Sequence, residues 1–436
     1  MYTGKDLIAW GFKPGPLFPD MIRVANSLDL PEDQIKAWVA KMEPTPIPQL
    51  EFHSTSRPFG VFLDASTHDE LANKQSVLET MDVLMRLPTV VKAVVMPDAC
   101  PAGVIPVGGV VATKDAIHPG FHSADVCCSM AITVFKRNDD PKKLLDTAMR
   151  VTKFGPEKRK SSDLIKVPKH VLDMMKGNPF LAQSEDIAQA HFATQGDGNH
   201  FLFVGHLEST GQLAMVTHHG SRGLGAQLYK RGMLAARRHT AIVARRAPPA
   251  AAWLDATSEQ GLAYWDALQT VREWTYQSHF AIHHEIARRM GNAMVDAFWN
   301  EHNFVFKRDD GLFYHAKGAT PSYNGYERTL IPMNMAEPIL ITAPTNNEDA
   351  LSFAPHGAGR NMSRTQFLRS YMPEPPANID IRYYTGMPDP SELPEAYKSA
   401  AGVIAQIKKY DLATITDRVL PYGNIMAGDT AWKRPS

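Results

Sequence analysis

Residues 214–225 read Ala214-Met215-Val216-Thr217-His218-His219-Gly220-Ser221-Arg222-Gly223-Leu224-Gly225. A short apolar run bounded by turn residues predicts a buried strand, and the polar, glycine-rich segment after it leads into a predicted helix. Similar β-rich runs occur at residues 60–63, 94–96, 130–135 and 201–204. These runs predict a mixed α and β protein with polar residues concentrated at strand ends, where functional sites are commonly built.

The composition limits the class of protein. A chain of 436 residues with 44% hydrophobic content is long enough for a large core. Its 46 basic and 46 acidic residues give no global basic field, so any contact with RNA must be local. Three cysteines, two of them adjacent, form no disulfide framework, and no run approaches the ~18 apolar residues that span a bilayer. We therefore expect a soluble cytoplasmic protein without a membrane partner.

The first 55 residues form an expected N-terminal extension, followed by a domain over residues 56–436. Residues 30–42 have helical spacing, and Pro44, Pro46 and Pro48 then stop the helix and indicate a linker. Further along, Thr257 with Gln260 predicts a capping box that opens a long helix, and Gly291 predicts its end.

Two segments predict metal ligands. Asp125 and Cys128, three residues apart on a turn, can converge on metal, with the thiolate bridging two ions. The alternative is a pair of buried small cysteines beside a turn aspartate. His200 enters a strand after Gly198 and Asn199, where glycine lets the backbone approach a ligand, although an ordinary hairpin turn explains the same pattern. His302, in Glu301-His302-Asn303, is weak evidence by itself.

Two further segments predict phosphate chemistry. The Ser221 hydroxyl, the Arg222 guanidinium and the backbone amides beside them predict an anion site at a helix start. In His356-Gly357-Ala358-Gly359-Arg360, the glycines clear space around the histidine ring, and Arg360 and Arg364 are expected on one face of the following helix. A neutral histidine nitrogen can attack a nucleoside triphosphate at phosphorus if a metal bears the developing charge. The alternative is a structural loop histidine.

Taken together and in this order, these segments resemble the RtcB-type RNA ligase family over roughly residues 90 to 430. The matching motifs also include Met96-Pro97-Asp98 and Lys317-Gly318-Ala319-Thr320. The resemblance implies a single large α+β domain with mixed sheets around a central metal cleft that holds two Mn²⁺ ions. It assigns Asp125, Cys128 and His200 to one ion, and Cys128, His218 and His302 to the other. The ligand types alone fit Zn²⁺ or Co²⁺ equally well.

The resemblance further implies that GTP guanylylates His356. The guanylate then activates an RNA 3′-phosphate, made by opening a 2′,3′-cyclic phosphate, for joining to a 5′-hydroxyl end. An archease-like activator is an implied partner. The implied nucleotide contacts are Asn199, Asn334, His356, Gly357, Gly359 and Tyr397. The implied phosphate or RNA contacts are Ser221, Arg222, Lys317, Arg360 and Arg364.

The chain departs from the family pattern around the base. Phe203 stands where the family usually has glutamate, and Met333-Asn334-Met335-Ala336 replaces a Gly-Ser-Met-Gly segment. Ala427-Gly428 replaces a terminal Lys-Gly, with residues 429–436 beyond it. Because buried polar groups supply much of the discrimination between bases, we expect nucleotide choice to be altered or relaxed.

Two other functions remain open from the sequence. A dinuclear metal-dependent phosphoesterase or nuclease needs the same ions and arginines but no histidine nucleophile. A non-catalytic relative that only binds RNA ends or a nucleotide would not need a complete set of metal ligands.

Overall fold

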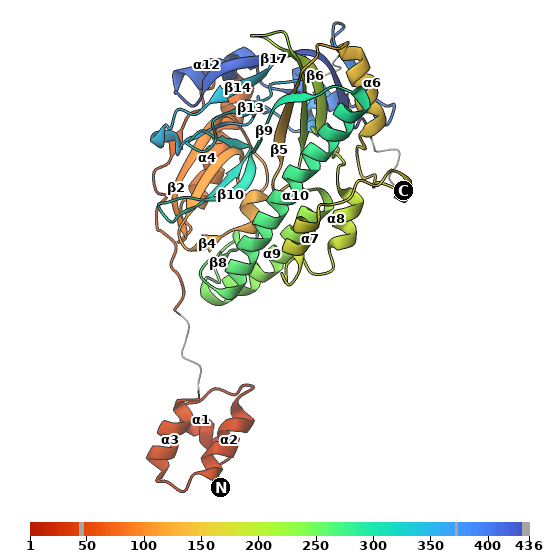
Figure 1. Cartoon of the computed structure of the whole chain (residues 1–436). Coiled ribbons are helices and arrows are strands. Elements are labelled where there is room, and N and C mark those ends of the chain that lie inside the picture. Colours follow the sequence, from red (N-terminus) through yellow and green to blue (C-terminus); the bar gives the residue numbers. More distant parts are fainter. Residues whose placement is uncertain (43–47, 371–373, 430–436) are drawn as a thin grey trace. The chain divides into compact units, whose positions relative to one another are not determined.

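The computed structural model describes residues 1–42, 48–370 and 374–429, and these fall into two compact units, Met1–Leu50 and Glu51–Ser436 (Figure 1). The smaller unit contains α1 (Gly4–Ala9), α2 (Phe18–Ser27) and α3 (Glu32–Ala40) around a core of its own that includes Leu7, Met21 and Val39. The predicted helix over residues 30–42 is confirmed as α3, which Pro31 precedes. The expected stop at Pro44 and Pro46 lies outside the described residues.

Two sheets form the framework of the larger unit. In the described part of the chain, the larger sheet runs in the order β13 (Thr329–Ile331), β14 (Ile339–Ala343), β17 (Thr414–Met426), β6 (Phe201–Leu207), β7 (Leu213–His219), β5 (Ser129–Phe135) and β9 (Met294–Glu301), and β16 (Asp380–Tyr383) pairs with β17. The other runs β1 (Gly60–Val61), β2 (Val90–Cys100), β3 (Val107–Thr113), β11 (Phe313–Lys317) and β10 (Asn303–Lys307). The pairs β4 (Ala116–Ile117) with β8 (Leu254–Asp255), and β12 (Ala319–Pro321) with β15 (Phe353–Pro355), are separate. The predicted α+β class is confirmed.

Helices cover these sheets. The long helices α9 (Arg222–Val243) and α10 (Glu259–Met290) pack together, and α10 also contacts α6 (Pro141–Val151) and α7 (Lys169–Met175) (Figure 1). Next to α9 lies α8 (Glu185–His191), and both α4 (His68–Leu84) and α12 (Ala400–Lys409) pack on β2. The short helix α5 (Pro119–His122) contacts α9, and the short helix α11 (Arg364–Ser370) begins with Arg364, which lines the cleft described below. No helix among the described residues is long and apolar enough to cross a bilayer.

The ends of the long helix α10 test the capping prediction. Thr257 as the cap is wrong: its hydroxyl donates to Asp255, and the Ser258 side chain instead accepts the Gly261 N–H at 3.1 Å. The predicted end is correct, because Gly291 adopts the left-handed conformation with φ 60°. The predicted strand at residues 214–217 is part of β7, and α9 begins three residues after that strand ends.

Candidate active site

The predicted metal ligands lie at the meeting point of several strand ends. Cys128 directly precedes β5, His200 directly precedes β6, His218 is near the end of β7 and His302 directly follows β9. Because β7 is antiparallel to both β5 and β6, the starts of those strands lie beside its end, and His218 pairs with Met130 and Phe201. The backbone N–H of His302 also donates to the Cys128 carbonyl at 2.9 Å. Strand pairing therefore gathers ligands that are far apart in sequence.

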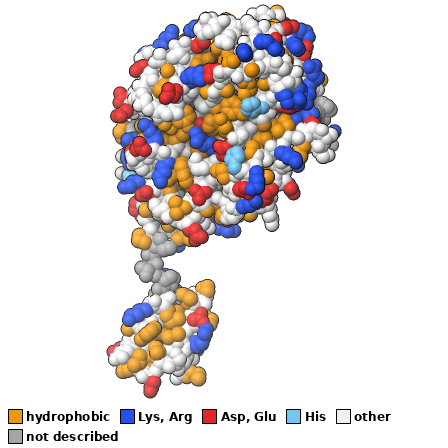
Figure 2. Space-filling model, viewed as in Figure 1, with side chains coloured by type: hydrophobic (Ala, Val, Ile, Leu, Met, Phe, Trp, Pro, Cys, Tyr) orange, Lys and Arg blue, Asp and Glu red, His pale blue; other side chains and the backbone are white. Residues whose placement is uncertain are grey.

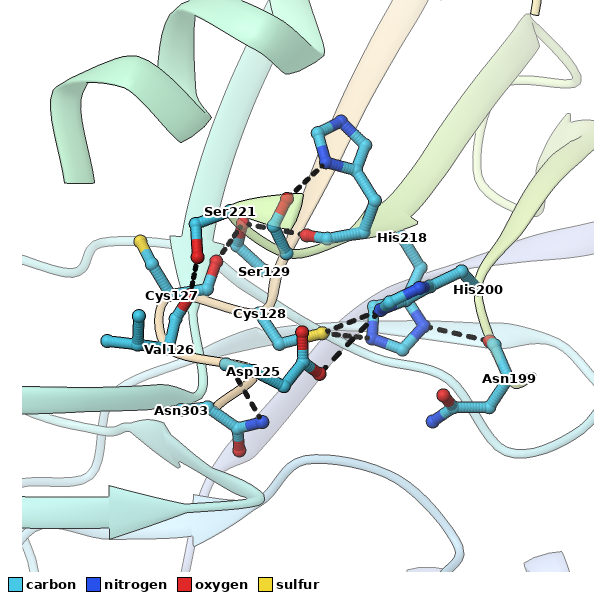
Figure 3. A network of polar contacts seen from close by, with 12 residues as sticks. Asp125, Val126, Cys127, Cys128, Ser129, Asn199, His200, His218, Ser221 and Asn303 are labelled. Atoms are coloured by element: carbon cyan, nitrogen blue, oxygen red, sulfur yellow. Dashed lines mark hydrogen bonds and ion pairs between the residues drawn. The ribbon is translucent and has the colours of Figure 1, made fainter. Parts of the chain in front are cut away.

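The ligand atoms form two groups of three that share Cys128. Its Sγ lies 3.3 Å from His200 Nε2 and 3.2 Å from His218 Nε2. His218 Nε2 lies 3.2 Å from His302 Nε2, and His200 Nε2 lies 3.7 Å from Asp125 Oδ2. One group is Asp125, Cys128 and His200, and the other is Cys128, His218 and His302. Figure 3 shows Asp125, Cys128, His200 and His218 pointing toward one another, whereas Cys127 points away.

The chemistry of this cluster fits divalent metal ions. Burial raises the pKa of the Cys128 thiol, lowers that of His218 to about 3, and lowers that of His302. His218 Nδ1 donates to the Asn199 carbonyl at 3.1 Å, so its Nε2 presents a lone pair to the cluster. The lone pairs of His218 Nε2 and His302 Nε2, with the two atoms 3.2 Å apart, repel each other unless a cation lies between them. Nitrogen, sulfur and oxygen donors 3.2–3.7 Å apart are the ligand set of a mid-series transition metal with bonds of about 2.0–2.3 Å.

His356 lies beside this cluster and is held by Asp98. The rings of His356 and His302 are 5.0 Å apart between centroids. The buried Asp98 carboxylate accepts hydrogen bonds from His356 Nδ1 at 2.6 Å and from its backbone N–H at 3.1 Å. Gly359, with φ 71°, lies so close to the Asp98 carbonyl that an added Cβ would be 1.9 Å from it. This arrangement keeps the proton on Nδ1 and leaves the Nε2 lone pair for attack on an electrophile.

Asp98 was not among the site residues predicted from the sequence. It appeared there only within the Met96-Pro97-Asp98 motif. The available signal was its position directly after an apolar run, the same context that identified the other site residues. Glu392, which lies 32 and 28 positions from the two arginines that it contacts, gave no signal in the sequence.

The expected placement of Arg360 and Arg364 on one helix face is wrong. Only Arg364 is helical, since α11 begins there, whereas Arg360 lies in the irregular segment before it. Both side chains instead converge on the buried Glu392, at 2.8 Å and 2.6 Å. The Tyr397 hydroxyl also donates to Glu392, and the Arg360 guanidinium lies over the Tyr397 ring. Two arginines therefore do meet at one place, but through a shared carboxylate.

The other three predicted phosphate contacts bind neighbouring carbonyl groups. The Ser221 hydroxyl donates to the Val126 carbonyl, and the Arg222 guanidinium donates to the Gly155 carbonyl. Lys317 Nζ donates to two backbone carbonyls in residues 102–105, and burial lowers its pKa to about 8. None of these three residues lines the cleft described next. Their side chains instead hold nearby backbone segments in place through these hydrogen bonds.

A cleft of about 630 Å³ opens beside His356. On one face of the larger unit, hydrophobic side chains gather beside histidines (Figure 2). The cleft is lined by His218 of the cluster, by apolar side chains that include Phe201 and Met335, and by Arg360 and Arg364. All six residues predicted to contact a nucleotide line it: Asn199, Asn334, His356, Gly357, Gly359 and Tyr397. Its size suits a nucleotide, since ligand pockets are typically ~300–1,000 Å³.

Comparison with known proteins agrees with this geometry. The family model described as tRNA-splicing ligase RtcB matches residues 81–178 and 171–427. The tRNA-splicing ligase RtcB of Aeropyrum pernix is 25% identical, covering 84% of this chain and 94% of that protein. The RNA-splicing ligase RtcB2 of Escherichia coli is 24% identical over 80% of this chain and 91% of its own. Because the family model matches well over half of the sequence, the chain belongs to the RtcB family.

Proposed function

We propose that this protein is an RNA ligase that joins 3′-phosphate or 2′,3′-cyclic phosphate ends of RNA to 5′-hydroxyl ends through a nucleotide bound covalently to His356. The observation that carries the proposal is the placement of His356, held by Asp98 with its Nε2 free, between the metal-ligand cluster and a nucleotide-sized cleft. Membership of a family whose relatives are named RNA-splicing and tRNA-splicing ligases supports the same reaction.

The metal ions belong to the proposal. Asp125, Cys128 and His200 would hold one divalent ion, and Cys128, His218 and His302 the other, with Mn²⁺ as the expected metal. When bound, such ions neutralise charge on phosphate oxygens during phosphoryl transfer.

The first step uses His356 as the nucleophile. Its Nε2 attacks the α-phosphorus of a nucleoside triphosphate, which the resemblance gives as GTP. A nitrogen–phosphorus bond forms, the bond to the bridging oxygen breaks, and pyrophosphate leaves. The ring becomes cationic as the bond forms, and the Asp98 carboxylate at 2.6 Å from Nδ1 stabilises that charge.

The remaining steps transfer the nucleotide and seal the RNA. Water first opens a cyclic phosphate to a 3′-phosphate, whose oxygen attacks the phosphorus bound to His356 and regenerates the free histidine. The 5′-hydroxyl then attacks the RNA 3′-phosphorus, a phosphodiester forms, and the nucleoside monophosphate leaves. Arg360 and Arg364 line the cleft and are the proposed contacts of the RNA phosphates, released in part from Glu392. An archease-like activator remains a prediction.

A ligation assay separates the three candidate functions. Purified protein with Mn²⁺ and nucleoside triphosphate is given one RNA that ends in a 2′,3′-cyclic phosphate and another that begins with a 5′-hydroxyl. We expect joined product from the wild type, none from His356→Ala, and wild-type yield from His170→Ala, which changes an exposed histidine outside the cleft. Hydrolysis without joining would favour a nuclease, and end binding without either reaction would favour a binding protein.

A further inference from the structure

Lys398 is a buried lysine two residues before α12, and its side chain contacts the segment that carries Asp98. Lysine is rarely buried unless its charge has partners. The Lys398 Nζ donates to the Pro97 carbonyl at 3.1 Å and to the Ala99 carbonyl at 2.7 Å. These carbonyls belong to the residues on either side of Asp98, which holds the ring of His356. The ammonium group therefore fixes the backbone on both sides of that carboxylate.

The backbone of Lys398 contacts the loop that carries His356. Its N–H donates to the Gly359 carbonyl at 2.9 Å, three residues after that histidine. Lys398 thus binds β2 through its side chain and the histidine loop through its main chain. A shift of one segment relative to the other would change the 2.6 Å contact between Asp98 Oδ2 and His356 Nδ1, so Lys398 is placed to hold that distance.

The ammonium group also supplies positive charge near the buried Asp98 carboxylate. Asp98 Oδ2 accepts both hydrogen bonds from His356, whereas Oδ1 has no hydrogen-bond partner among the described residues. Burial lowers the pKa of Lys398, and the negative charge of Asp98 is the largest influence that opposes this shift. A buried carboxylate is strongly disfavoured as an anion without an opposing charge, so Lys398 stabilises the charged form that accepts from His356.

We infer that Lys398 is a positioning residue for nucleotide transfer, which holds the Asp98 carboxylate, and through it the His356 ring, in the orientation for attack; this rests on the proposed function. Among the described residues, Lys398 is not part of the cleft lining, so it acts through Asp98 and does not touch the nucleotide. The ring becomes cationic as the nitrogen–phosphorus bond forms and pyrophosphate leaves. A carboxylate that is already held in place stabilises this charge without having to reorganise.

Lys398→Met removes the ammonium group at similar side-chain length, and the Ala99 carbonyl keeps a hydrogen bond from Asn73 Nδ2 at 2.8 Å. In single-turnover label transfer from α-³²P nucleoside triphosphate with Mn²⁺, we expect this variant to react at least about tenfold more slowly than the wild type. Its metal content and its dissociation constant for the nucleotide should be unchanged. Lys398→Arg keeps the charge and should recover part of the rate. The matched control is Lys92→Met, an exposed lysine on the same strand as Asp98, which should react at the wild-type rate.

A double variant separates positioning from a general loss of structure. If Lys398 acts through Asp98, Asp98→Asn combined with Lys398→Met should be no slower than Asp98→Asn alone, because the contact that Lys398 supports is already lost. Two independent roles would instead multiply the two rate losses. If Lys398→Met does not fold, Lys398→Gln removes the charge, keeps hydrogen-bond donors and carries the same expectations.

The outcomes distinguish this inference from the proposed function. A wild-type rate in the folded Lys398 variant, or multiplied losses in the double variant, would overturn the inference and leave the ligase proposal intact, provided that the wild type is labelled on His356. A wild-type protein that is not labelled on His356 would overturn the proposed function, and the inference that rests on it.

Discussion

Replacing Asp98 with asparagine should slow nucleotide transfer to His356 while sparing the metal cluster. The Asp98 carboxylate accepts two hydrogen bonds from His356 and is fully buried. A hydrogen bond to a charged group contributes about 1.5–3 kcal/mol, which corresponds to roughly 10–150-fold in rate. The asparagine amide can also turn its NH₂ group toward Nδ1, which moves the ring proton to Nε2 and removes the nucleophilic lone pair.

The tautomer change sets the upper limit of the effect. The equivalent change from aspartate to asparagine in a serine protease triad lowers the rate about 10⁴-fold for the same reason. For Asp98→Asn we therefore expect a decrease of about 10²- to 10⁴-fold, combining this limit with the loss of a charged hydrogen bond.

The assay is a single-turnover measurement of label transfer from α-³²P nucleoside triphosphate in the presence of Mn²⁺. Metal content measured in parallel should equal that of the wild type, because Asp98 belongs to neither group of candidate ligands. Asp82→Asn, which changes an exposed aspartate on α4, is the control and should react at the wild-type rate. A rate for Asp98→Asn within threefold of the wild type would refute the role of this carboxylate in orienting the ring.

Further predictions concern the metal ligands and the smaller unit. Cys128→Ser should lower the amount of metal bound per chain after dialysis, because both ligand groups share this thiolate. Cys127→Ser is the control and should keep the wild-type metal content, because its side chain points away from the cluster. Equal loss of metal in both variants would contradict the assignment. Removing metal with a chelator should lower the melting temperature reversibly, because an ion at 100 times its dissociation constant stabilises the folded state by about 2.7 kcal/mol. An unchanged melting temperature would argue against buried metal. Deleting Met1–Leu50, which has its own core, should leave nucleotide labelling at the wild-type level, and loss of labelling in a folded truncation would show that this unit contributes to the reaction.

The sequence was most informative where a residue type that binds metal adjoins the end of a predicted strand. Cys128 and His200 could be proposed as ligands because each adjoins an apolar run and each is a residue type that binds transition metals, whereas the family resemblance assigned His218. Strand pairing then brings them together, and the order of motifs along the chain predicted the α+β class. The six predicted nucleotide contacts also line one cleft, although they lie in loops and turns beside several different elements.

Contacts that depend on the path of loops could not be predicted. Arg360 and Arg364 have helical spacing, yet the segment after Gly359 is irregular and both side chains turn to Glu392. The Ser221 hydroxyl resembles an anion ligand in sequence, but folding places the Val126 carbonyl against it. The orientation of the Asn424 amide depends on a backbone carbonyl of a distant turn, which no local pattern reveals.

Intact-mass and peptide mass spectrometry of the full chain, after incubation with Mn²⁺ and ATP or GTP, tests the central claim most directly. The wild type should gain the mass of one nucleoside monophosphate, and the modified peptide should carry it on His356, while His356→Ala should gain nothing. A wild-type protein that binds metal and gains no mass, or one that carries the nucleotide on another residue, would contradict the account.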